Sequence, residues 1–355
     1  MMRLYAVMLL LLTVLCGCMT AASELPSLEP PAEAQVQPPA EGQQATYQFS
    51  VAFTGNSYSK KVYQAAANIE KRTDGDLKLV IFSDGQMGTD AEIIQAVQNG
   101  TLSIAAANTA IFQPLVPQAA VTNIPACYTQ YVQPYISYDG EFYQQFNRCF
   151  NEAGFELLVQ EASGYRLLTS ASSITALDQL GELRIRTLNN RFHVRLWELL
   201  GAEPYQNIEW SELYYALQEG VVEAQDNPLE IIRMGRLQDI HPYALNGPFF
   251  VTYNSLAMNK AAYDALPEAY RKILKEELYE AMAENITRMR KNPVEVYGLT
   301  INSLSQDDQE LLKARLLPML NEIEQETGLD LTNALIIENQ LKNSESAVRL
   351  SDSAR

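Results

Sequence analysis

Short apolar segments alternate with amphipathic segments along the first part of the chain. Strands are predicted at 47–53 (YQFSVAF), 77–82 (LKLVIF) and 102–107 (LSIAAA). Helices are predicted between them, where apolar residues recur at helical spacing: from about 55–57 to 72, and 90–100. Thr89 is a suitable N-cap for the second helix, and Gly100 ends it. Strands and helices that alternate with short turns are typical of a parallel α/β sheet.

The pattern resumes further along the chain. Helices are predicted at 138–152 and 190–200, and strands at 155–160, 165–170, 183–188 and 248–259. The last of these strands has little charge, which suits a strand that crosses between two lobes. From Lys260 to about 340 the spacing of Glu, Lys and Leu predicts helices, and the tail at 344–355 is expected to be frayed. Two α/β lobes joined by crossing strands describe the periplasmic binding protein fold.

The segment EWSELYYALQEGVVEAQDNPLE (209–230) combines a short aromatic-rich helix with a polar end. The helix begins near Trp210 and stops at Gly220, and a strand is predicted at Val221 and Val222. That strand is expected to end on Asp-Asn-Pro at 226–228. Ligands of open α/β sheets bind at the carboxyl ends of strands, so the polar end is predicted to lie in a ligand crevice.

The N-terminal segment has the pattern of an export signal. Arg3 precedes an apolar run at 4–15, which is too short to span a bilayer comfortably. Leu-Cys-Gly-Cys follows and resembles a lipobox, so residues 1–18 are interpreted as a lipoprotein signal with lipidated Cys18. An ordinary cleaved signal with an incidental cysteine is the alternative. Residues 19–46, rich in Pro, Ala and Gln, are expected to form an extended tether outside the fold.

Composition narrows the classes of partner. The chain is 47% hydrophobic and 19% charged, as in a globular protein, and its 355 residues favour two domains. Its formal net charge is −17, from 26 basic and 43 acidic residues, which argues against nucleic-acid binding. Cys127 and Cys149 remain outside the signal; an exported protein permits a disulfide between them, and two free thiols are the alternative.

The sequence shows no catalytic or metal-binding pattern. His193 and His241 are far apart and lie in no metal-ligand spacing. No nucleophile elbow, phosphate-binding loop or dinucleotide fingerprint occurs. We therefore expect neither a metal nor a cofactor, and an enzyme on this scaffold is the less favoured alternative.

Five segments, in order, resemble the substrate-binding (P) subunits of TRAP transporters, the tripartite ATP-independent periplasmic systems. The segments are SDGQMGTDAEIIQAVQNGTLSIA (83–105), GYRLLTS (164–170), LRIRTLNN (183–190), 209–230 and MNKAAYDALPEAYRKIL (258–274). The resemblance covers roughly residues 47–320. It departs from the family pattern at Glu182, Glu223, Ala224, Asp226 and Asn108. The resemblance implies a binding protein, not an enzyme, that captures a small organic acid for a membrane permease.

The same resemblance implies a set of ligand contacts. Arg186 would form the bidentate salt bridge to the ligand carboxylate, and Arg166 would make a second contact. Hydrogen bonds or packing contacts would come from Asn189, Asn227, Trp210, Asn108 and Asn56. Taken alone, the residues permit other interpretations: a structural salt bridge for Arg186, an exposed strand arginine for Arg166, a turn for Asn227 and a core position for Trp210.

The resemblance also implies an arrangement of lobes and partners. Lobe 1 is expected to comprise 47–165 and 249–270, lobe 2 to comprise 166–248, and 271–355 to form C-terminal helices. The protein would lie on the extracytoplasmic side of a membrane, anchored by lipid and associated with TRAP permease subunits. Some lipoprotein P subunits associate with a tetratricopeptide-repeat lipoprotein, and the departures at Glu182 and Asn108 leave open such a partner with a more apolar ligand.

Overall fold

The computed structural model describes residues 47–54, 59–130, 133–291 and 298–353. The predicted signal peptide, the lipidation site at Cys18, the tether at 19–46 and Asn56 lie outside these residues. Within them, no helix is both long enough and apolar enough to cross a membrane.

The first strands and helices lie where the hydrophobic pattern predicts them. They are β1 (Tyr47–Ala52), α2 (Ser59–Arg72), β2 (Leu77–Phe82), α3 (Asp90–Gln98) and β3 (Ile104–Asn108). β1 pairs in parallel with β2 and β3, as a sheet with helical crossovers requires. α3 begins with a capping box: the Thr89 hydroxyl accepts from the Glu92 N–H, and the Glu92 carboxylate accepts from the Thr89 N–H at 2.8 Å.

One long strand, β5 (Phe155–Ser170), belongs to two ladders of strands. Residues 155–165 pair antiparallel with β10 (Val251–Asn259), and 166–170 pair antiparallel with β8 (Ala224–Pro228). Gly164 lies at this change of partner with a φ of +144°, a conformation that favours glycine. The sequence predicted two separate strands here and gave the crossing role to 248–259. The prediction of two separate strands is wrong, because β5 is continuous. In the described part of the chain, β10 pairs with β3 and β5.

We call β2-β1-β3-β10-β5 the first ladder and β5-β8-β6-β7 the second ladder. The second ladder contains β6 (Arg184–Arg186) and β7 (Glu203–Tyr205), and β9 (Tyr243–Asn246) pairs with β5 and with β11 (Thr300–Ser303). The prediction of a strand at Val221 and Val222 is wrong. β8 begins at Ala224, and Asp226 and Asn227 lie buried inside it.

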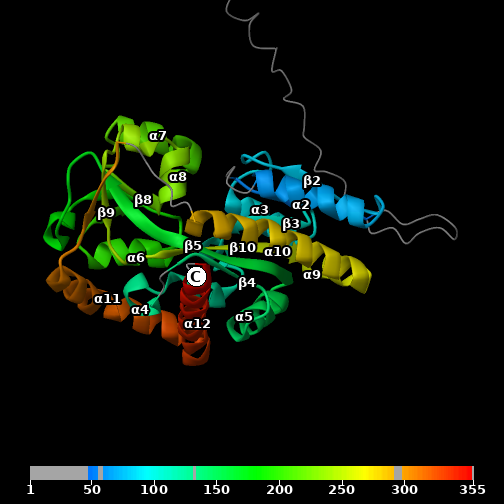
Figure 1. The fold of residues 1–355 in the computed structure, drawn as a ribbon. Coiled ribbons are helices and arrows are strands. Elements are labelled where there is room, and N and C mark those ends of the chain that lie inside the picture. The colour runs from blue at the N-terminus through cyan, green and yellow to red at the C-terminus, as the bar shows by residue number, and fades with distance from the viewer. Residues whose placement is uncertain (1–46, 55–58, 131–132, 292–297, 354–355) are drawn as a thin grey trace, which may run out of the picture. The chain divides into compact units, whose positions relative to one another are not determined.

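Helices cover both ladders (Figure 1). The remaining elements are η1 (Thr109–Phe112), η2 (Pro117–Asn123), α4 (Ala126–Thr129), β4 (Tyr135–Ser137), α5 (Glu141–Glu152), η3 (Leu177–Leu180), α6 (Arg191–Leu199), α7 (Trp210–Gln218), α8 (Leu229–Met234), η4 (Leu237–Asp239), α9 (Lys260–Asp264), α10 (Glu268–Lys291), α11 (Gln306–Thr327) and α12 (Leu329–Ser353). α10 packs on α2, α11 on η2 and α6, and α12 on α5. The tail predicted to be frayed is helical as far as Ser353.

Apolar side chains form three clusters that fix these layers. The largest contains side chains from both ladders and from α5, α6, α11 and α12. The second lies between the first ladder and the helices α2 and α10, and the third joins the second ladder to α7 and α8. Cys127 and Cys149 are both free thiols, and burial raises the pKa of Cys127 to about 12.

Two histidines are buried in the neutral form. His193 stacks on Phe250 with ring centroids 3.9 Å apart, and Nδ1 of His241 lies 3.1 Å from the carbonyl oxygen of Thr169. Burial lowers the pKa of His193 to about 3 and that of His241 to about 4. Unfolding exposes both rings to water, where their pKa returns to about 6.5.

We predict that acid weakens the fold through these two rings. Below pH 6.5 the unfolded chain binds two protons that the folded chain excludes, so stability falls until pH reaches the folded pKa values. Each histidine accounts for about 2 kcal/mol between pH 7.5 and pH 5. Chemical denaturation at the two pH values measures the change, and a His193→Gln/His241→Gln variant should show a flatter profile. An unchanged slope in that variant would contradict the prediction.

Candidate ligand-binding site

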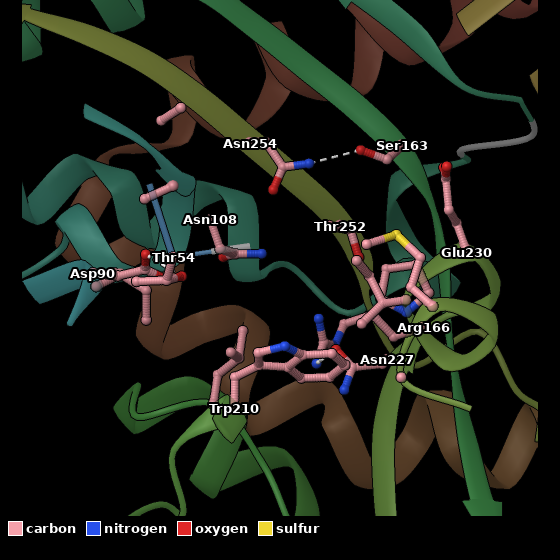
Figure 2. Close-up of a pocket in the computed structure, with 18 of the residues that line it drawn as sticks. Thr54, Asp90, Asn108, Ser163, Arg166, Trp210, Asn227, Glu230, Thr252 and Asn254 are labelled. Atoms are coloured by element: carbon pink, nitrogen blue, oxygen red, sulfur yellow. Dashed lines mark hydrogen bonds between the residues drawn. The ribbon is translucent and has the colours of Figure 1, made fainter. Parts of the chain in front are cut away.

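A cavity of about 720 Å³ is lined by residues from both ladders. Cavities of this size hold small molecules. Six of the seven predicted contacts line it: Arg186, Arg166, Asn189, Asn227, Trp210 and Asn108. The seventh, Asn56, lies outside the described residues. Figure 2 shows Thr54, Asp90 and Asn108 on one side of the cavity and Arg166, Asn227 and Glu230 on the other.

Arg186 is a buried guanidinium group that has no carboxylate partner among the described residues. It is the last residue of β6 and only 7% exposed. Its Nε donates to the carbonyl oxygen of Ile208 at 2.9 Å. Its two terminal nitrogens form no hydrogen bond or ion pair with the part of the chain that the structure describes. Burial, followed by the nearby charge of Arg166, lowers the pKa of Arg186 to about 10, so the group stays charged at neutral pH.

Arg166, in contrast, has a partner inside the protein. Its Nε lies 2.5 Å from Oδ2 of Asp226, and a terminal nitrogen donates to the Asp226 carbonyl and to Oδ1 of Asn227. The hydroxyl of Thr187 donates to the other carboxylate oxygen of Asp226 at 3.2 Å. Burial is the largest single influence and by itself would raise the pKa of Asp226. The charge and the hydrogen bond of Arg166, together with smaller contributions from neighbouring groups, outweigh burial and lower that pKa. The sequence left open a structural salt bridge for Arg186, but in the structure Arg166 forms such a salt bridge.

The predicted asparagines differ in how far their side chains are engaged. Asn227 accepts from Arg166 and donates through Nδ2 to Gln225 at 2.6 Å, so it is fixed within β8. Oδ1 of Asn108 accepts from the N–H of Ala110 at 3.0 Å and caps η1. This bond leaves the amide nitrogen of Asn108, which points into the cavity in Figure 2.

Asn189 and its neighbour Asn190 have different roles. Asn189 is exposed and lines the cavity. Asn190 is buried, accepts from the N–H of Phe192 at 2.9 Å as the cap of α6, and donates to the carbonyl of Ala110 at 2.8 Å. Asn190 thus joins the start of α6 to η1, which follows β3 of the first ladder.

Trp210 begins α7 and forms part of the cavity wall. Its indole packs over Gly235, where an added Cβ would lie 2.8 Å from Cη2 of the ring. A glycine at this position therefore allows the close approach of the ring. The partly buried indole packs on the third apolar cluster and also lines the cavity, so the two alternatives for this residue, core and contact, are compatible.

The cavity also contains polar residues that were not predicted from the sequence as ligand contacts. The Thr54 hydroxyl donates to Oδ1 of Asp90 at 2.7 Å, and Oγ1 of Thr252, a residue 5% exposed, has no hydrogen-bond partner in the described chain. Asp90 directly follows the N-cap Thr89, after the carboxyl end of a predicted strand. Because ligands bind at the carboxyl ends of strands, this position could have indicated Asp90 as a cavity residue. Thr252 lies inside a nearly uncharged strand, where nothing in the sequence marks it.

The charges around the cavity are mixed. Its lining contains the cations Lys61, Arg166 and Arg186 and the carboxylates Asp84, Asp90, Glu161, Glu209 and Glu230. Among the described residues, no group of three or more His, Cys, Asp or Glu side chains is arranged to hold a metal ion. The arrangement suits the binding of a small polar molecule.

The chain matches a known family over most of its fold. The model of the bacterial extracellular solute-binding protein family 7, DctP, matches residues 50–326. The chain belongs to this family. The match confirms the resemblance to TRAP solute-binding subunits, and the family binds solutes rather than converting them.

Individual relatives are distant in sequence. The chain is 25% identical to a solute-binding protein of Verminephrobacter eiseniae, over 64% of this chain and 68% of that protein. It is 23% identical to the ectoine-binding periplasmic protein TeaA of Halomonas elongata, over 68% of this chain and 74% of that protein. The same fold occurs in a TRAP solute-binding protein of Ralstonia eutropha H16, solved with bound (S)-2-acetolactate. The two structures align with a TM-score of 0.72 at 16% sequence identity, and the alignment covers 82% of this chain and 98% of that chain.

We predict that the Arg166–Asp226 pair stabilises the fold. Asp226→Ala leaves a buried guanidinium without its partner, which should lower the free energy of unfolding by about 3–5 kcal/mol. Denaturation with urea measures the loss. The matched control is Glu223→Ala, which breaks the exposed Arg184–Glu223 pair and should cost less than about 1 kcal/mol. Equal losses in the two variants would show that the buried pair has no special structural role.

Proposed function

We propose that the protein is the solute-binding subunit of a TRAP-type secondary transporter and captures a small organic acid whose carboxylate is bound by Arg186. The observation that supports this most directly is a charged, buried guanidinium that faces a cavity with its terminal nitrogens unpaired in the described chain. A buried charge without a partner is costly, and a ligand carboxylate would remove that cost.

Known ligands of related proteins agree with an acid. YiaO of Escherichia coli, 22% identical over 60% of this chain and 65% of that protein, is a 2,3-diketo-L-gulonate-binding periplasmic protein. A sugar acid binding protein of Advenella mimigardefordensis was solved with galactonate; its TM-score is 0.69 at 18% identity, with 84% of this chain and 99% of that chain covered. These ligands all have a carboxylate.

The physical chemistry of the site favours the same class of ligand. A guanidinium presents a rigid fork of donors that matches a carboxylate, and its charge-assisted hydrogen bonds strengthen where water is excluded. We assign further contacts to Arg166, Asn189, Asn227 and Trp210. Arg166 is already bonded to Asp226 through its Nε and one terminal nitrogen. It would therefore contact the ligand through its other terminal nitrogen.

We predict that Arg186→Ala abolishes measurable binding. Removal of one partner of a desolvated charge-assisted bond costs about 2–5 kcal/mol. Thermal shift against mono- and dicarboxylates, keto acids and sugar acids identifies a ligand, and calorimetry then compares the variant with the wild type. The matched control is Arg184→Ala, which lies two residues away in the same strand and outside the cavity lining. Retained binding in Arg186→Ala would remove the proposed anchor.

In the same calorimetric series, Asn108→Ala tests how the lobes share the contacts. We infer that lobe 2 holds the acid through Arg186, and that lobe 1 closes over it through Asn108 and Asn56 by movement about a hinge. Loss of a neutral hydrogen bond from Asn108 should cost about 1 kcal/mol and speed release. If Asn108→Ala were more damaging than Arg186→Ala, this division between the lobes would be wrong.

We also propose that the protein is anchored to a membrane through lipid on Cys18 and joined to the fold by the tether at 19–46. The support is the lipobox-like sequence. Metabolic labelling with a radioactive fatty acid should label the expressed full chain, and Cys18→Ser should remove the label and release the protein into the soluble fraction. Labelling that survives in Cys18→Ser would refute this site.

Action through a tetratricopeptide-repeat lipoprotein on a more apolar ligand is the second candidate. It is favoured by the amide at Asn108, where the family pattern has a carboxylate, and by the tether. Genes adjacent to the one encoding this chain discriminate the two candidates. A permease pair alone supports the first, and an adjacent repeat-protein gene supports the second.

A further inference from the structure

Negative charge predominates in the cavity, which a simple carboxylate ligand does not explain. Five carboxylate residues and three cationic residues line it. A carboxylate that enters such a cavity gains from Arg186 but is repelled by acidic side chains such as Asp90. A ligand that also has a positive charge removes this conflict.

Asp90 is the acidic side chain best placed to receive that charge. It is the first residue of α3, where the hydroxyl of Thr54 holds one of its carboxylate oxygens at 2.7 Å. Burial raises the pKa of Asp90, the charge of Glu209 raises it further, and the charge of Arg186 lowers it. Asp90 is therefore close enough to interact electrostatically with the proposed anchor, and a ligand cation would favour its ionised form.

Asp90 and the ion-paired Arg166 lie on opposite sides of the cavity. Figure 2 shows Asp90 and Thr54 on one side, Arg166 and Asn227 on the opposite side, and the indole of Trp210 between them. The face of an indole attracts cations, and the attraction is stronger where water is excluded. The part of the cavity wall formed by Trp210 is thus suited to a cationic group.

Two nearly buried polar groups show that the cavity is built for a ligand and is more than an acidic patch. Arg186 is 7% exposed with its terminal nitrogens unpaired in the described chain, and Thr252 is 5% exposed with no hydrogen-bond partner there for its hydroxyl. Both line the same cavity as Asp90. Unsatisfied buried groups of this kind are rare in proteins, and a bound ligand accounts for them.

We propose that the ligand is a zwitterion, whose carboxylate binds Arg186 and whose cationic nitrogen faces Asp90 and the indole of Trp210. The inference rests on the proposed function, because it takes Arg186 as the carboxylate anchor. It narrows the ligand from organic acids in general to small amino or quaternary ammonium acids.

Pairs of compounds that differ only in the positive charge test the proposal. Glycine betaine has 3,3-dimethylbutanoate as its isostere without the positive charge, and L-proline has tetrahydrofuran-2-carboxylate. Calorimetry on the full chain with both pairs, and with galactonate as a polyhydroxylated acid without a cation, should show the zwitterion bound about tenfold more tightly within its pair. Tighter or equal binding of 3,3-dimethylbutanoate or galactonate would overturn the proposal.

Variants distinguish this inference from the proposed function. Asp90→Asn keeps a side chain that can accept from Thr54 but removes the charge. The tenfold preference should therefore disappear, while the acids without a cation should bind as tightly as before or more tightly, because a repelling carboxylate is gone. Asp307→Asn is the matched control, because Asp307 lies in the first turn of α11, is exposed, and is not part of the cavity lining. An intact preference in Asp90→Asn refutes the zwitterion site alone. Acid binding that survives Arg186→Ala refutes the carboxylate anchor on which it rests.

Discussion

The site depends on one constraint: two guanidinium groups are buried near one another, and one buried carboxylate is bonded to only one of them. Asp226 is paired with Arg166, while the bond of Arg186 within the described residues runs from its Nε to a carbonyl oxygen. Each arginine raises the electrostatic cost of the other, which is why the charge of Arg166 contributes to the lowered pKa of Arg186. The fold satisfies the first cation internally and leaves the second available to a ligand.

This distribution of charge follows from the course of β5. Arg166 is the first β5 residue paired with β8, and the register places Leu168 opposite Asp226 and Leu167 opposite Asn227. β6 then pairs with the other edge of β8, which brings Arg186 opposite Gln225. A single strand therefore joins the first ladder to the second and also places the ion pair beside the free guanidinium. A shift of register by one residue would turn these side chains to the opposite face of the sheet.

Local signals in the sequence were enough to predict the early strands and helices. The capping box at Thr89 and the amphipathic segments up to β3 depend on neighbouring residues, and the structure confirms them. β5 was predicted as two strands because Ser163 and Gly164 interrupt its apolar pattern, whereas its continuity depends on pairing with distant β10. β11 has mostly exposed residues and was missed for the same reason: only its pairing with β9 defines it.

The candidate site, like the fold, has features that local sequence predicts and features that depend on the pairing of distant strands. The motifs located six side chains that line one cavity, but they did not show which arginine is engaged by the protein, because that depends on the pairing of β5 with β8. The family pattern has Glu where this chain has Asp226, and the shorter carboxylate is fully buried against Arg166 and Thr187. Both carboxylate oxygens of Asp226 already accept hydrogen bonds inside the protein. Asp226 is therefore poorly suited to pair with Arg186 in place of a ligand. A shorter acid at this position is therefore compatible with an arginine that remains available to a ligand.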